Sequence, residues 1–211
     1  MTRSHRGAIA LAFLAAAACA TTAMSTSGAV SPNSVAANQL HDAMRKLWSD
    51  HVFWTRLYIN EAVAGLPSAQ NTAARLMKNQ EDIGNAVATY YGTAAGNQLT
   101  NLLKQHISIA VDLVSAAKAN DQAKVADANN RWHANANDIA TFLSGANPNW
   151  PKATVLDMLN QHLALTTQEA TAQIQGNWAA SSAAFDNIYN EILPMADALS
   201  SGIVKQFPNR F

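Results

Sequence analysis

The stretch Leu47-Trp48-Ser49-Asp50-His51-Val52 determines how the rest of the chain is interpreted, because its pattern returns twice. Two apolar residues, two polar residues, a histidine and an aliphatic residue follow one another. The same order recurs in Leu102-Leu103-Lys104-Gln105-His106-Ile107 and in Met158-Leu159-Asn160-Gln161-His162-Leu163. The histidines are 55 and 56 residues apart, and a nearly constant period of this length indicates a repeated structural unit.

Around the first histidine the apolar residues recur in steps of three and four. Met44, Leu47, His51, Trp54 and Tyr58 fall on one stripe, which is the periodicity of an amphipathic helix that buries one face. The same spacing places His106 and His162 on the apolar stripes of their own segments. We therefore expect all three histidines to face the interior.

Helical periodicity continues through the chain from Val35 onward, and the alternation typical of strands is absent. Breaks containing glycine, proline or asparagine separate six expected helices, the last with a bend at Pro194. These helices cover about 35–64, 68–91, 97–119, 121–144, 151–176 and 178–205. Because such short breaks make neighbouring helices antiparallel, the sequence predicts an all-α bundle of about six helices, arranged as three repeated hairpins.

The first residues carry arginines and are followed by a short apolar run, the pattern of a secretory signal. We expect residues 1–19 to be a signal peptide, residues 20–34 a flexible tether and residues 35–211 the bundle. Cys19 ends the apolar run, which leaves two readings open: a lipidated N-terminal cysteine or an incidental residue near the cleavage point. The protein is then exported, to the periplasm, the cell envelope or the medium, and contacts a membrane only through such an anchor.

Charge excludes some partners. Without Arg3 and Arg6 the chain has 12 basic and 14 acidic residues, so it lacks the basic surface that nucleic acid requires. No nucleophile elbow or phosphate-binding glycine loop is present. The sequence names no reaction, and we expect binding rather than catalysis.

Three histidines delivered by three helices form a ligand set suited to zinc, copper or iron. The candidate ligands are His51, His106 and His162, and the polar residues expected to orient their rings are Asn79, Asp82, Asn135 and Asp138. The competing interpretation is that each imidazole is a core residue, kept because a buried polar group needs a hydrogen-bond partner. A duplicated hairpin would inherit either kind of histidine.

Three longer motifs extend the pattern: Leu47-Trp48-x-x-His51-x-x-Trp54-Thr55-Arg56, Asn79-x-x-Asp82-Ile83-Gly84-Asn85 and Gly202-Ile203-Val204-Lys205-Gln206-Phe207-Pro208. With these motifs the chain resembles a family of bacterial exported helical proteins, some of whose members are labelled glycosyltransferases. The resemblance covers nearly all of the mature chain and implies a helical bundle. It carries over no functional residue, and the chain lacks the parallel-strand pattern of nucleotide-sugar transferases.

The sequence thus predicts an exported helical bundle that binds a metal ion, or a small ligand containing a metal, through three core histidines. The alternative is a structural or protein-interaction module of the cell envelope without a bound cofactor. A metal-dependent redox or hydrolytic enzyme is a third interpretation. Convergence of the three imidazoles would favour the first, and wide separation would favour the second.

Overall fold

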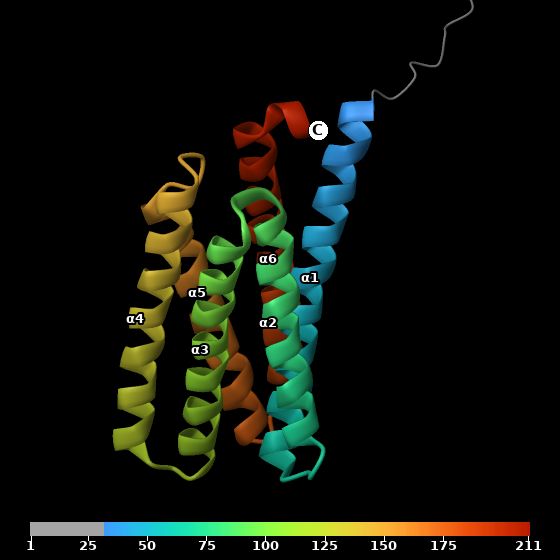
Figure 1. Ribbon diagram of the computed structural model, residues 1–211. Coiled ribbons are helices and arrows are strands. Elements are labelled where there is room, and N and C mark those ends of the chain that lie inside the picture. Colours follow the sequence, from blue (N-terminus) through green and yellow to red (C-terminus); the bar gives the residue numbers. More distant parts are fainter. Residues whose placement is uncertain (1–31) are drawn as a thin grey trace, which may run out of the picture. The chain divides into compact units, whose positions relative to one another are not determined.

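The computed structural model describes residues 32–211, so the predicted signal peptide, Cys19 and most of the predicted tether lie outside the described residues. Within this range the chain forms six α-helices and a closing 3₁₀ turn, without a strand (Figure 1). Their bounds are α1 Pro32–Ala64, α2 Ala69–Tyr91, α3 Thr93–Lys118, α4 Gln122–Ala146, α5 Lys152–Ile174, α6 Trp178–Gln206 and η1 Pro208–Arg210. The all-α prediction is confirmed.

The six helices form a closed ring. Each helix packs against its neighbours in sequence, and α6 returns to pack against α1. Successive helices run in opposite directions (Figure 1), so α1, α3 and α5 run the same way. These three also contact one another. They therefore form an inner set, and each carries one of the repeated histidines.

The helix ends follow local chemistry. Asp121 caps α4 by accepting a hydrogen bond at its Oδ1 from the Lys124 backbone N–H, at 3.1 Å, and aspartate is among the residues that favour this position. Helix α1 begins at Pro32, so the last residues of the predicted tether belong to the bundle. Helix α6 runs through Pro194 without ending.

The turn between α2 and α3 differs from the prediction. Gly92 alone joins the two helices, with φ of +86°, a conformation that glycine adopts without steric cost. Helix α3 therefore begins at Thr93, four residues before the expected start at Asn97. Gly96 lies within α3 and serves helix packing instead of the turn.

Gly84 and Gly96 bring α2 and α3 into close contact. A Cβ at Gly84 would lie 2.7 Å from the carbonyl oxygen of Gly96, and a Cβ at Gly96 would lie 2.6 Å from the carbonyl oxygen of Gly84. Real Cβ atoms do not approach backbone oxygens this closely. The two glycines thus set the separation of these helices.

The end of the bundle near the α4–α5 connection is closed by aromatic residues. The buried indole of Trp150 lies against Gly202, and its Nε1 donates to the carbonyl oxygen of Ala198 at 3.3 Å. Tyr91 packs 5.6 Å from the Trp150 ring, and its hydroxyl donates to Gln206 Oε1. Of the helices described, none is long and apolar enough to cross a membrane.

Candidate histidine centre

The three repeated histidines lie inside the bundle. His51 on α1, His106 on α3 and His162 on α5 are only 3%, 4% and 4% exposed, which confirms that they face the interior. The rings of His51 and His162 are in contact, with centroids 5.6 Å apart. The ring of His106 packs against Trp132, at 5.2 Å. The structure therefore brings two histidines together and places the third beside a tryptophan.

Each histidine is held through its Nδ1 by the following helix, and the partner always comes 29 residues later. His51 Nδ1 lies 3.2 Å from Gln80 Nε2. His106 Nδ1 lies 2.8 Å from Asn135 Oδ1, and His162 Nδ1 lies 3.1 Å from Glu191 Oε2. The position of the histidine's partner is thus the same in all three hairpins, whereas the residue type at that position differs.

Asn79 and Asn135 share a second task, which is to tie the outer helix to the inner one. Asn135 Nδ2 donates to the carbonyl oxygen of Leu102 at 3.1 Å, and Asn79 Nδ2 donates to that of Leu47 at 3.0 Å. Both carbonyls lie four residues before a histidine. In the first hairpin Gln80 holds the ring and Asn79 holds the backbone, whereas Asn135 does both.

Of the four predicted orienting residues, only Asn135 bonds to a histidine ring; Asn79 bonds to the backbone and to Gln80, and the two aspartates lie away from the histidines. Asp82 is paired with Lys78 and Arg75 at the surface, and Asp138 is exposed. Matching the carboxylates of the first two hairpins selected positions 31 and 32 residues after the histidines, which face outward. Glu191, 29 residues after His162, appeared from the sequence to depart from this pattern and was left out of the predicted set, and Gln80 was missed. The constant interval of 29 residues identifies both.

Hydrogen bonding assigns the ring protons. Because Asn135 Nδ2 is used by Leu102, its oxygen faces His106, so His106 Nδ1 donates. His162 Nδ1 likewise donates to the Glu191 carboxylate. In the neutral His106 ring, Nε2 then carries a free lone pair. Gln80 donates to His51 Nδ1 instead, so His51 carries its proton on Nε2.

Burial favours the neutral form of His51 and His106. It lowers the pKa of His106 to about 4, with the charge of nearby His162 as the second cause. Burial also lowers the pKa of His51 well below its ordinary value, helped by the two other histidines. Neutral imidazole is the form that binds a metal.

Unpartnered polar atoms gather around the histidines. Seven buried side-chain atoms of the described residues have no hydrogen-bond partner. Five of them belong to residues that contact a histidine or follow one by a single helical turn: Trp48 Nε1, Gln80 Oε1, Trp132 Nε1, Thr166 Oγ1 and Glu191 Oε1. Orphaned buried polar atoms are costly and uncommon in native proteins. We call the three histidines and these five neighbours the histidine layer. The concentration of unpartnered atoms in this layer favours a bound ligand there.

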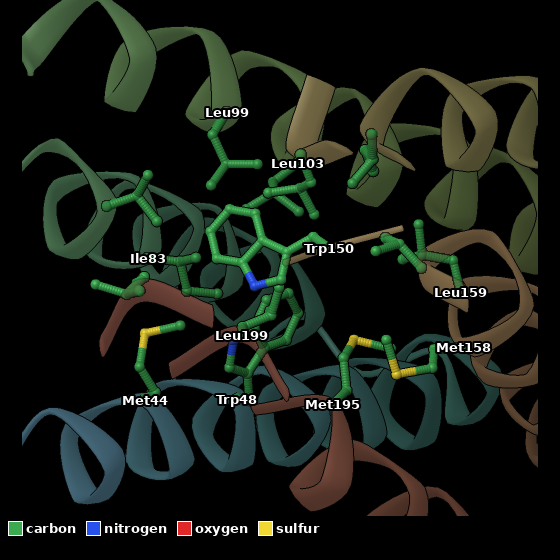
Figure 2. Close-up of a pocket in the computed structure, with 15 residues that line it drawn as sticks. Met44, Trp48, Ile83, Leu99, Leu103, Trp150, Met158, Leu159, Met195 and Leu199 are labelled. Atoms are coloured by element: carbon green, nitrogen blue, oxygen red, sulfur yellow. The ribbon is translucent and has the colours of Figure 1, made fainter. Parts of the chain in front are cut away.

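Two small cavities flank the layer. The first, of about 20 Å³, is lined by residues that precede the histidines on the inner helices, among them Met44, Trp48 and Leu159. Figure 2 shows the Trp150 indole in the middle of this region, with the thioethers of Met158 and Met195 next to each other on one side of it. The second, of about 30 Å³, is lined by residues that follow the histidines, including Thr55, Ala110 and Thr166.

A buried ion pair lies further along α5. Arg56 donates to the carboxylate of Glu169 at 2.6 Å and to the carbonyl oxygen of Ser181 at 3.2 Å. Glu169 is 1% exposed, and burial raises its pKa to about 7, while the charge of Arg56 acts in the opposite direction. This carboxylate already has a cation, in contrast to Glu191.

A serine, a histidine and an aspartate meet between α1 and α6. His41 Nδ1 lies 2.7 Å from Ser200 Oγ, and His41 Nε2 lies 2.9 Å from Asp197 Oδ1. Ser200 is fully buried, however, and its hydroxyl donates to the carbonyl oxygen of Ala196. A nucleophile needs access to substrate and a base that accepts its proton, so this cluster ties two helices together.

No three or more His, Cys, Asp or Glu side chains in residues 32–211 already surround a common point as metal ligands. No protein-family model, curated protein or solved structure matches the chain significantly. The function must therefore be argued from the histidine layer itself.

The low pKa of His106 predicts acid sensitivity. The folded state holds this ring neutral to about pH 4, whereas the unfolded chain protonates it near 6.5. Its contribution to stability is therefore complete above pH 6.5 and is lost as the pH falls to 4, by up to about 3 kcal/mol. The raised pKa of Glu169 changes the stability in the opposite direction between pH 7 and pH 4.5. Because Glu169 is present in both wild type and His106→Gln, its contribution cancels in the stability difference between them.

We expect the stability difference between wild type and His106→Gln to change by about that amount between pH 7.5 and pH 4. Urea unfolding with a chelator present measures it. A difference that stays constant with pH would show that His106 is not buried in a neutral state.

Proposed function

We propose that this protein binds a zinc, copper or iron ion, or a small ligand containing one, through His51, His106 and His162. The observation that carries the proposal is the concentration of orphaned polar atoms around three buried imidazoles. Metal-binding histidines commonly donate their other ring N–H to a carboxylate or carbonyl oxygen. His162 with Glu191, and His106 with Asn135, have this arrangement.

The ring separation is compatible with ligation. Two imidazoles bound to one ion at about 2.0–2.1 Å and at tetrahedral to trigonal angles have centroids about 5.2–5.5 Å apart. The centroids of His51 and His162 are 5.6 Å apart. Binding requires the ring of His106 to turn from Trp132 towards this pair. It also requires the proton of the neutral His51 ring to move from Nε2 to Nδ1, where the Gln80 amide must turn its oxygen towards the ring to accept it.

Charge also favours a cation. The side chain of Glu191 is 6% exposed, and its carboxylate pairs with the imidazole of His162 at 3.1 Å. A buried carboxylate is unfavourable unless positive charge or hydrogen-bond donors lie beside it. A divalent ion held by the histidines would add positive charge next to this carboxylate. Glu169 cannot share this role, because Arg56 pairs with it.

The alternative, a structural or protein-interaction module, is favoured by a different observation. Each Nδ1 already has a partner, and no described set of side chains converges as metal ligands. In that case the histidines only connect inner and outer helices. The two proposals differ in what added metal does to the folded protein.

Elemental analysis and thermal unfolding of the purified mature protein separate them. We expect about one transition-metal ion per chain and a melting temperature that falls when a chelator removes it. Metal at 100 times its Kd stabilises the folded state by about 2.7 kcal/mol, which is about 5–10 °C for a domain of this size. If the purified protein contains no metal and its melting temperature does not change with zinc, copper, iron or chelator, the metal proposal is wrong and the structural module is favoured.

Export is part of the proposal, supported by the charged and apolar start of the chain. For Cys19 both interpretations, a lipidated N-terminal cysteine and an incidental residue near the cleavage point, stay open. The mass of the mature N-terminus, measured on membrane fractions, distinguishes an acylated cysteine from an unmodified end after residue 19.

A further inference from the structure

We infer that the outer face of α6 binds a second copy of this chain, so that the protein is a symmetric dimer in which the two α6 helices cross. The face carries two features that fit each other: an exposed tryptophan, Trp178, and a hollow lined by Phe185, Asp186, Tyr189 and Asn190. The inference does not depend on a bound metal, because this face is on the outside of the bundle and the histidines are buried inside it.

Exposed large hydrophobic side chains are confined to two neighbouring helices and one turn. Within residues 32–211 five such residues are exposed, and all of them belong to α1, to the turn after α1 or to α6. They are Val35, Phe53, Leu66, Trp178 and Tyr189. Helices α1 and α6 pack against each other. Contiguous exposed apolar surface on a soluble protein commonly marks an interaction site.

The hollow on α6 matches the chemistry of an indole. Its volume is about 470 Å³, and the rings of Phe185 and Tyr189 on its apolar side are 6.4 Å apart. Asp186 and Asn190 supply hydrogen-bond acceptors on its polar side. Trp178, which is 62% exposed, offers an apolar ring system with one N–H donor. It begins α6 about 10–18 Å before the hollow, so the hollow can receive only the indole of another copy.

A two-fold axis near Ser182 and Ala183 makes this face self-complementary. The axis lies midway between Trp178 and the hollow, so two antiparallel α6 helices that cross there place each indole at the level of the other copy's hollow. The exposed residues at the crossing are small, namely Ala179, Ala180, Ser182 and Ala183. Because the side chains at a helix contact set the distance between the axes, this stretch allows the two helices to approach closely.

Charge favours a second copy over nucleic acid or an anionic membrane. On α6 between residues 178 and 196, Asp186 is the only exposed charged residue. The arginines beside this face, Arg45 and Arg56 on α1, are paired with carboxylates of the same chain. The full chain has 14 basic and 14 acidic residues, and a protein near zero net charge does not repel its own copies.

The size of the face reaches what a specific interface needs. From Trp178 to Pro194, α6 is about 25 Å long. The flank of α1 that carries Phe53 lies beside it, since Arg56 lies over the Phe185 ring at 4.7 Å. Two helices side by side are about 20 Å wide, which gives about 500 Å² in projection and more once protruding side chains are counted. Specific interfaces take about 600–1,000 Å² from each partner, so we expect a dimer at the lower end of this range.

Sedimentation of the purified mature protein over a wide range of concentrations, with a chelator present, tests the inference. Wild type should shift from monomer to dimer as its concentration rises. Trp178→Ala should weaken association at least tenfold, because a tryptophan that enters a pocket dominates an interface. Ala183→Arg should abolish it, since a long charged side chain at the crossing keeps the helices apart. Leu66→Ala is the matched control, because it removes an exposed apolar side chain outside the crossing.

Cross-linking tests the position of the axis. In a chain that also carries Cys19→Ser, Ala183→Cys should form a disulfide between two copies on oxidation, because residues beside a two-fold axis meet their own counterparts. Ala134→Cys, which replaces an exposed alanine of α4, is the control and should not.

The variants are expected to fold, because Trp178 and Ala183 are exposed, and cooperative melting near the wild-type temperature checks this. A protein that sediments as a monomer at every concentration overturns the inference. A dimer that persists unchanged in both Trp178→Ala and Ala183→Arg also overturns it, since the copies then associate through another face. Because the chelator is present throughout, neither result depends on whether the chain binds a metal ion.

Discussion

We expect each of the variants His51→Ala, His106→Ala and His162→Ala to lose the metal-dependent rise in melting temperature. Each should also retain metal at least 100-fold less well. The reason is that a three-ligand shell that loses one imidazole is open on a second side, and loss of only an orienting partner already costs 10–100-fold in affinity. Titration of the apo protein with zinc, followed by thermal unfolding and elemental analysis, measures both quantities.

The pattern among the variants distinguishes a metal site from ordinary packing. If the histidines only fill the core, each variant should lose a few kcal/mol according to its own cavity and orphaned partner, with or without metal. His133→Ala is the control, because His133 is exposed and bonds to Asn160 outside the layer. A variant that still gains stability from zinc would remove its histidine from the ligand set.

Gly84→Ala should lower the stability of the protein by about 3 kcal/mol and its melting temperature by about 10 °C. The new methyl group would meet Thr100 and the carbonyl oxygen of Gly96, and only a shift of α2 against α3 can relieve the second contact. That shift also disturbs Gln80 and Asn79, which come from the same helix. Urea and thermal unfolding measure the effect.

Gly145→Ala is the matched control within α4. This glycine is exposed and has no neighbour within 4 Å of a built Cβ. The substitution should raise stability by about 0.5 kcal/mol, because alanine favours the helix. If both variants destabilise the protein equally, the close approach of α2 and α3 does not explain the role of Gly84.

The helices and their order were predictable because periodicity and breaks are local features. The breaks between helices could be interpreted from a few neighbouring residues, because glycine, proline and asparagine mark them. Gly96 could not, because a glycine between two helices looks the same whether it ends a helix or allows another to approach. Only the position of Gly84 on the facing helix decides between these roles.

The site was predictable in part for a similar reason. The three histidines share a visible pattern and were placed correctly in the core, as was the contact of Asn135 with His106. Their partners were harder to find, because Gln80, Asn135 and Glu191 are chemically different residues at one repeated position. The pair Arg56–Glu169 is separated by 113 residues and shares no motif.

The constant interval of 29 residues has a consequence for how the interior is charged. Three separate, identical hairpins assembled around an axis could place either no carboxylate or three carboxylates behind their histidines. In one continuous chain each copy can differ, and here only the third position is an acid, Glu191, beside the amides Gln80 and Asn135. Joining the copies covalently therefore breaks their equivalence and allows a single acidic residue behind one of the three histidines.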